Sequence, residues 1–202
     1  MLYKEENSVN DIIIEQKEND IRDYKFKNCN ENINIEKIEI ANCMFENCKI
    51  IESKLINIYF TNVIFKNSDF SNTNFNESNF VNCIFENCKF IGSNFINTSI
   101  YKSKIKESNL EYSNLSNSNI KETSFEETNL SMSSFGECKF KKIKFNDCSL
   151  YKAQMFRTNL KSIDFRTCNI EGITVDKEDL NGLIVNDFQA IELSKLLGII
   201  VK

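Results

Sequence analysis

The side chains best suited to chemistry in this chain are its eight cysteines. Cys43 and Cys48 form one closely spaced pair, and Cys83 and Cys88 form another. The four-residue gap within each pair does not match the usual zinc knuckle. The chain contains no histidine, so a zinc site would need Cys or carboxylate ligands alone, and no Ser–His or Cys–His pair can form. We therefore expect no catalytic, metal or cofactor site and no enzyme activity.

The cysteines instead follow a strict period of five residues. From Ile35 to Val185 every fifth residue is Ile, Leu, Phe, Met or Val, and from Phe60 to Phe95 it is always Phe. We call this residue the centre. A period of five fits neither an α-helix, with about 3.6 residues per turn, nor a flat strand, with a period of about 2. Such self-similarity is the signature of a repeat architecture, in which stacked units bury a continuous core.

Each position of the five-residue block has its own preference. The residue two before the centre is usually Ser or Thr, and in seven blocks it is Cys (Cys43, Cys48, Cys83, Cys88, Cys138, Cys148 and Cys168). A large and a small side chain pointing inward would fill the interior without overpacking it. Asn recurs just before the centre, where we expect it to suit a sharp corner, because it bonds nearby backbone and tolerates unusual dihedrals. The other two positions are variable and polar.

Four blocks would complete one square turn, and the backbone would pair with the turns above and below, as in a parallel sheet. One centre every five residues gives nearly eight coils about 4.8 Å apart, and a core roughly 35 Å long. The pattern resembles the pentapeptide-repeat family, whose blocks combine a small residue, Asp or Asn, Leu or Phe, and two polar positions. The resemblance implies an all-β fold, a right-handed quadrilateral parallel β-helix, here with a short C-terminal α-helix.

Three segments follow from this pattern: an N-terminal arm or cap (1–20), the repeat β-helix (21–185), and a C-terminal segment for capping and dimerisation (186–202). In the first, Ile12 to Ile14 could form either a capping strand or a flexible arm. Ile21 and Phe26 keep the five-residue spacing, with Tyr24 and Cys29 as possible inward residues, and the spacing then slips by one residue before Ile35.

The period ends after Val185, and the pattern becomes helical. Asn186 and Gln189 form a capping-box pattern, and Gly198 suits a left-handed helix end. We expect a β-prone tail after it, at residues 199–201. The helix would plug the open end of the stacked sheets, and its many apolar side chains also favour an interface.

Residues 180–201 resemble the C-terminus of the Qnr quinolone-resistance proteins. The matching residues are Leu180, Gly182, Phe188, Gln189, Ala190, Leu197, Gly198 and Ile199. The resemblance implies a homodimer joined head to head, here through Phe188, Ile191, Leu196, Leu197, Ile199 and Ile200. It also implies a rod that mimics B-form DNA and binds DNA gyrase or topoisomerase IV. The unbroken spacing leaves no room for the two loops that project from the gram-negative Qnr proteins. The rival hypothesis is a repeat scaffold or adaptor for another protein partner.

Charge and hydropathy set further expectations. The net charge of −4 argues against direct nucleic-acid binding, which needs a basic surface. The chain shows neither a signal-peptide pattern nor the apolar run of about 20 residues that spans a bilayer, so we expect a soluble, cytoplasmic protein.

Surface charge can be sorted by face, since each coil repeats the faces of the last. One face would carry lysines 102, 104, 121, 141, 142, 144 and 161 against Glu122 and Asp164. The acidic faces would carry the candidate partner-binding residues Glu46, Glu77, Glu86, Glu126, Glu127 and Glu137. The alternative is ordinary solvated charge that keeps the rod soluble.

Overall fold

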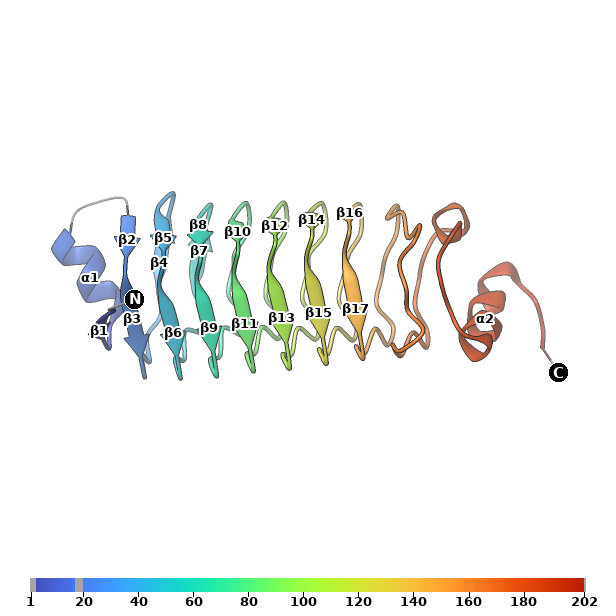
Figure 1. Ribbon diagram of the computed structural model, residues 1–202, viewed down its shortest axis with the longest axis horizontal. Coiled ribbons are helices and arrows are strands. Elements are labelled where there is room, and N and C mark those ends of the chain that lie inside the picture. Colours follow the sequence, from blue (N-terminus) through green and yellow to red (C-terminus); the bar gives the residue numbers. More distant parts are fainter. Residues whose placement is uncertain (1–2, 17–19, 202) are drawn as a thin grey trace.

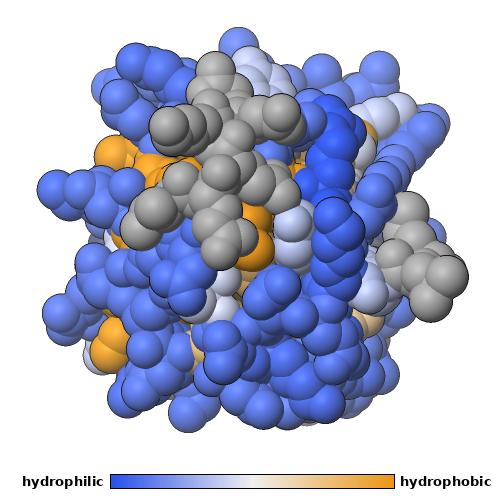
Figure 2. All heavy atoms as spheres, turned by 90° about the vertical axis from the view of Figure 1, so that its left-hand side faces the viewer, coloured by the Kyte–Doolittle hydropathy of each residue, from blue (hydrophilic) through white to orange (hydrophobic). Residues whose placement is uncertain are grey.

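The protein is a rod of stacked square coils, with the chain termini at opposite ends (Figure 1). The computed structural model describes residues 3–16 and 20–201. Seen from the N-terminal end, the outline is roughly square and mostly hydrophilic, with apolar residues showing near the middle (Figure 2). This is the parallel β-solenoid that the five-residue period predicts.

Two long parallel sheets form adjacent faces of the rod. The first follows the order β1 (Lys4–Glu6), β3 (Tyr24–Lys27), β6 (Met44–Glu46), β9 (Ile64–Lys66), β11 (Ile84–Glu86), β13 (Lys104–Lys106), β15 (Ser124–Glu126) and β17 (Lys144–Asn146). The second contains β2 (Asp20–Arg22), β5 (Glu39–Ala41), β8 (Tyr59–Thr61), β10 (Asn79–Val81), β12 (Ser99–Tyr101), β14 (Asn119–Lys121) and β16 (Lys139–Lys141).

The other two faces are paired more sparsely. They hold the short sheet of β4 (Asn34–Glu36) and β7 (Lys54–Ile56) and a series of single parallel bridges such as Asp69 with Lys89. Centres of successive coils are direct partners in the two long sheets, as Phe65 and Phe85 are in β9 and β11, and the single bridges on the other faces join residues just before the centres. Each coil therefore stacks in register on the next.

Within residues 3–16 and 20–201 the helical segments are α1 (Val9–Gln16), η1 (Lys177–Leu180), α2 (Asp187–Ser194) and η2 (Lys195–Leu197). No strand forms at residues 199–201, so the expectation of a β-prone tail is wrong. Gly198 does adopt the predicted left-handed conformation, with φ 75°.

The expectation of a strand or a flexible arm at Ile12 to Ile14 is also wrong, because helix α1 includes these residues. The Glu31 carboxylate accepts the backbone N–H groups of Val9 (2.5 Å) and Asn10 (3.3 Å). Satisfying the free N–H groups of the first turn stabilises a helix start. Val9 and Ile12, three residues apart, are buried in the core, so tertiary packing selects the helix.

The centres form the core, as predicted. Rings stack face to face between neighbouring coils; the centroids of Phe65 and Phe85 are 4.8 Å apart. Tyr24 and Cys29 also point inward. Between residues 40 and 175, a stretch described throughout, Phe140 is the one centre that is not fully buried.

The small inward residues tie neighbouring coils together. The Ser103 hydroxyl accepts the backbone N–H of Cys83 at 3.0 Å and donates to the Phe80 carbonyl at 3.4 Å. A hydroxyl at this position thus satisfies buried backbone groups that no strand pairing reaches. All eight cysteines are buried free thiols.

The corner residue differs from the one predicted. Positive φ angles recur two residues after the centre, as at Asn62 (φ 55°) and Asn82 (φ 54°), and not at the Asn just before it. That earlier Asn instead uses its side chain, as Asn114 Oδ1 accepts the N–H of Ser116 at 3.0 Å. The predicted hydrogen bonding is therefore confirmed, and the predicted dihedral is wrong. The true corner amides also link coils, since Asn82 Nδ2 donates to Asn62 Oδ1 at 3.2 Å.

Candidate protein-interaction surfaces

The C-terminal end of the rod exposes apolar side chains. Phe188 is 84% exposed and Ile200 is 82% exposed. Ile191, Leu197 and Ile199 are also exposed. Of the six residues predicted for the dimer interface, Leu196 alone is partly buried, because it packs against the core.

The plug beneath this apolar surface depends on Gln189. Its Nε2 donates to the carbonyls of Phe165 and Cys168, each at 2.7 Å. Its Oε1 accepts the Asn186 N–H at 2.9 Å, while Asn186 Oδ1 accepts the Gln189 N–H at 3.0 Å. The predicted capping box is therefore present. Because an amide closes the last coil, the apolar side chains of α2 remain available on its outer side. The sequence pattern identified the cap but gave no sign that Gln189 points inward.

Three of the predicted acidic residues alternate with lysines along one face. The partners in successive strands of the eight-stranded sheet run Lys27, Glu46, Lys66, Glu86, Lys106, Glu126. We call this series the charged row. If each five-residue block formed one face, these glutamates would lie on a different face from the lysine-rich one. In the structure, Lys104 and Lys144 lie in the same eight-stranded sheet as these glutamates. That separation is wrong, because the corner falls two residues after each centre rather than at the block boundary.

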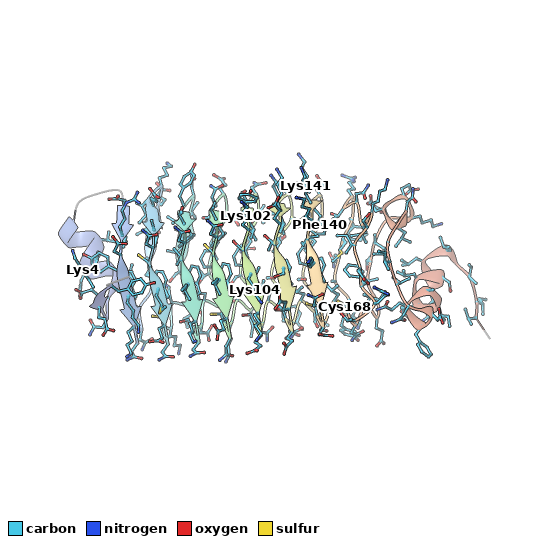
Figure 3. All side chains as sticks on the ribbon, in the orientation of Figure 1. Lys4, Lys102, Lys104, Phe140, Lys141 and Cys168 are labelled. Atoms are coloured by element: carbon cyan, nitrogen blue, oxygen red, sulfur yellow. The ribbon has the colours of Figure 1, made fainter. Side chains whose placement is uncertain are left out.

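Ion pairs neutralise much of this acidic charge. Lys25 Nζ lies 2.9 Å from Glu46, and Lys104 Nζ lies 2.6 Å from Glu126. The hydrogen bond from Lys104 lowers the pKa of Glu126 below its ordinary value. Lys102, Lys104 and Lys141 come from the central part of the rod (Figure 3).

The remaining predicted glutamates lie on two corners. Glu77 and Glu137 share one corner column, where Glu137 pairs with Arg157 at 3.1 Å. Glu127 lies on the diagonally opposite corner, between Glu107 and Asp147 in the adjacent coils. We call Glu107, Glu127 and Asp147 the corner carboxylates. Among the described residues neither Glu127 nor Asp147 has a salt-bridge partner within 4.0 Å. The six predicted residues therefore do not form one surface, and sequence reasoning missed two of the corner carboxylates despite their regular spacing.

Other kinds of site have little support in the described residues. No three His, Cys, Asp or Glu side chains within residues 3–16 and 20–201 gather as they would around a metal ion. Burial raises the pKa of Cys83 and Cys88 to about 12, which disfavours the reactive thiolate. In the same ranges no helix has the length and apolarity needed to cross a membrane.

Comparison with known proteins defines the class. A family model described as a pentapeptide repeat region matches residues 38–115, 78–155 and 113–175. The chain therefore belongs to the pentapeptide-repeat family. No curated protein matches the sequence.

Similar solved structures include QnrB1, a plasmid-mediated fluoroquinolone resistance protein, in a trypsin-treated form. It is 19% identical, with a TM-score of 0.38 and 91% of each chain covered. HetL, a pentapeptide repeat protein involved in heterocyst differentiation regulation in the cyanobacterium Nostoc, is 9% identical, with a TM-score of 0.34, over 81% of this chain and 90% of that chain. A pentapeptide repeat protein of the Arabidopsis thaliana thylakoid lumen is 15% identical, with a TM-score of 0.41, over 65% of this chain and 71% of that chain.

Proposed function

We propose that this protein is a homodimeric, non-enzymatic rod that binds a type II topoisomerase, DNA gyrase or topoisomerase IV, and modulates its activity or its sensitivity to quinolones. The observation that carries the proposal is the exposed apolar end on a segment whose sequence resembles the Qnr C-terminus. A protein with this function would act in the cytoplasm, together with its target.

The dimer is the first step of the argument. Phe188 and Ile200 are each more than four-fifths exposed, and large exposed apolar side chains clustered at one place mark an interaction site. Gln189 already closes the coil, so these side chains are not needed as a plug. A two-fold contact between two such ends is self-complementary and closed. The result would be a rod twice as long, with the same surface on both halves.

The charge that mimics DNA is assigned to the corner carboxylates. Coils repeat about every 4.8 Å along the rod, and one strand of B-form DNA places a phosphate every 3.4 Å or so along its axis. Glu127 and Asp147, without salt-bridge partners among the described residues, present charge at a comparable density, whereas Glu107 is paired with Lys106 at 2.7 Å. The glutamates of the charged row contribute less, because lysines neutralise them.

The dimer is tested by sedimentation of the full chain and of a chain ending at Val185. We expect a dimer for the full chain and a monomer for the shortened one. A full chain that sediments as a monomer at micromolar concentration contradicts the proposal.

Partner binding is tested in a gyrase supercoiling assay, with and without ciprofloxacin. We expect Glu107→Gln, Glu127→Gln and Asp147→Asn together to abolish the effect on gyrase, and to remove the salt dependence that charge-steered binding shows. Changing Glu46, Glu86 and Glu126 to Gln removes the same charge and serves as the matched control, with little effect expected. Equal loss in both triple variants would exclude the corner carboxylates as the contact.

A second candidate function is a scaffold or adaptor for another protein. The charged row favours it, because opposite charges alternate from Lys27 to Glu126 along the eight-stranded sheet and leave no continuous acidic surface there. A wild-type protein that dimerises but has no effect on either topoisomerase would select this function.

A further inference from the structure

The stack of coils opens on two faces near its C-terminal end. No backbone hydrogen bond joins residues 139–146 to residues 159–166, although both segments are fully described. One coil earlier, by contrast, the Glu122 N–H donates to the Lys141 carbonyl at 2.9 Å. The amides of Phe140 and Lys142, which face the next coil, have no backbone acceptor there. The other two faces remain paired, through Ser149 with Asn169 and Gln154 with Thr174.

The opening has a cause in the small inward column. In the coils before it this column contains Ser103 and Thr123, and the Thr123 hydroxyl accepts the Ser103 N–H at 3.4 Å. In the next two coils the same column contains Ile143 and Ile163. Neither can accept a hydrogen bond, so the hydroxyl link between coils that Thr123 provides to Ser103 is missing here. The coils separate beside them, and Phe140 loses its full burial.

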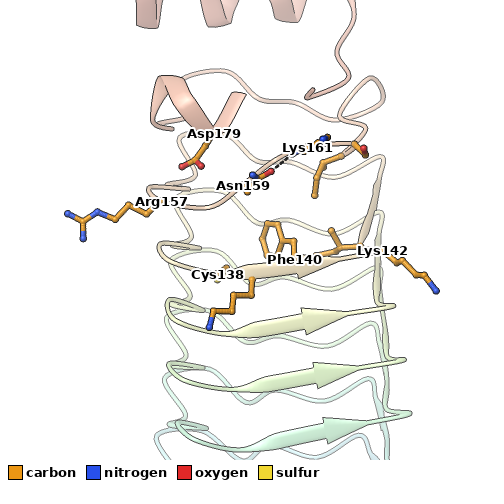
Figure 4. A pocket seen from close by; sticks show the side chains of 11 residues that line it. Cys138, Phe140, Lys142, Arg157, Asn159, Lys161 and Asp179 are labelled. Atoms are coloured by element: carbon orange, nitrogen blue, oxygen red, sulfur yellow. Dashed lines mark hydrogen bonds between the residues drawn. The ribbon is translucent and has the colours of Figure 1, made fainter. Parts of the chain in front are cut away.

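The separation creates a cleft of about 670 Å³. Figure 4 shows the Phe140 ring standing between β16 and the chain at Asn159 to Lys161. Phe140, Ile143 and Ile163 line the cleft with apolar surface, and lysines 139, 142 and 161 with Arg157 bring positive charge. Its one acidic lining residue is Asp179.

Two of these cations are available for a ligand. Arg157 is paired with Glu137, and Lys142 Nζ lies 3.4 Å from Glu122. Lys139 and Lys161 have no salt-bridge partner among the described residues. The cleft therefore combines the partly exposed ring of Phe140 with two ammonium groups that have no salt-bridge partner within the described part of the chain and two backbone N–H groups that have no acceptor in the next coil.

We propose that this cleft binds a small organic anion with an apolar body, such as an aromatic carboxylate. The apolar part would cover the ring of Phe140, and the carboxylate would accept hydrogen bonds from the free amides and from Lys139 or Lys161. The volume lies in the usual range for small-molecule sites, about 300–1,000 Å³. A purely polar anion gains nothing from the apolar lining, and a neutral molecule leaves the cations unpaired. The site is independent of the proposed topoisomerase binding and uses none of its residues.

The probe is 1-naphthoate, with the neutral 1-naphthalenemethanol as its counterpart, and binding to the full chain is measured by calorimetry. We expect naphthoate to bind at least 10-fold more tightly than the alcohol and to slow exchange of the Phe140 and Lys142 amides. Lys139→Gln with Lys161→Gln should weaken naphthoate binding at least 10-fold. Lys54→Gln with Lys89→Gln, on other faces, is the matched control and should bind as the wild type does. No binding by the wild type, or equal loss in both double variants, overturns the proposal.

Closing the cleft provides an independent test. Ile143→Thr with Ile163→Thr restores the hydroxyls of the small column, so the missing hydrogen bonds should form. Exchange of the Phe140 and Lys142 amides should slow, and naphthoate should no longer bind. The Phe188→Ala variant, altered at the exposed end, should bind normally. Unchanged binding in the double threonine variant, or loss of binding in Phe188→Ala, would show that the probe occupies another surface.

Discussion

Gln189→Met tests how the C-terminal plug is held. Methionine has nearly the same volume as glutamine but cannot form the three side-chain hydrogen bonds to Phe165, Cys168 and Asn186. A buried hydrogen bond contributes roughly 0.5–1.5 kcal/mol net, so the loss should be about 3 kcal/mol. Since about 1.4 kcal/mol corresponds to a tenfold change in an equilibrium constant, α2 should open about 100-fold more often.

The assay is hydrogen exchange of the α2 amides. In a solenoid each repeat contacts only its neighbours, so exchange should accelerate in residues 187–197 and remain unchanged in residues 60–95. The dimer should dissociate at higher concentrations as well. Gln154→Met, at an exposed site, is the control and should change neither property. The reasoning is refuted if α2 exchanges at the wild-type rate, or if the whole rod loosens equally.

Three further predictions concern the repeat itself. Phe85→Ala should lower the free energy of unfolding by about 3–5 kcal/mol, as urea denaturation would show; an unchanged midpoint would contradict burial of the centre. Lys102 has φ 51°, so Lys102→Asn should raise stability by about 0.5–1 kcal/mol in thermal melts, whereas Lys104→Asn in a strand should not. Burial raises the pKa of Cys83 to about 12 from 9.0, so its stabilising effect is full below pH 9 and is lost as pH rises towards 12. Cys83→Ser should reduce the fall in stability between pH 8 and 10.5, and an identical pH dependence would exclude this cause.

The five-residue period was sufficient to predict the coil and its core, because every centre must be a large apolar side chain that points inward. Asn186 and Gln189 likewise predicted the start of a helix, because the capping box depends only on residues close together in the sequence. The corner was misplaced by three positions, because Asn is frequent both before the centre and two residues after it, for different reasons. The α1 helix was missed because the run Ile12 to Ile14 is equally compatible with a strand. The helix is favoured by hydrogen bonds from its first turn to Glu31, which is distant in the sequence.

The surfaces were harder to predict than the core. Whether Glu86 faces a lysine depends on where the chain turns. A corner predicted at the wrong position assigns the charged residues of every coil to the wrong face. The cleft was missed because each isoleucine alone fits the period. Val63 occupies the same column, yet its coil stays bonded to the next, since the Asn62 N–H donates to the Val81 carbonyl at 2.9 Å. The stack opens between the coils of Ile143 and Ile163. Dimerisation and partner binding depend on a second molecule, which one chain's periodicity cannot specify.

The charged row restricts how this rod can change length during evolution. Opposite charges face each other across each pair of strands from Lys27 to Glu126, and like charges placed directly opposite are destabilising. Duplicating or deleting one coil inside the row would set glutamate against glutamate or lysine against lysine. Duplicating or deleting two coils would preserve every pair. The number of coils gained or lost within this part of the chain should therefore be even.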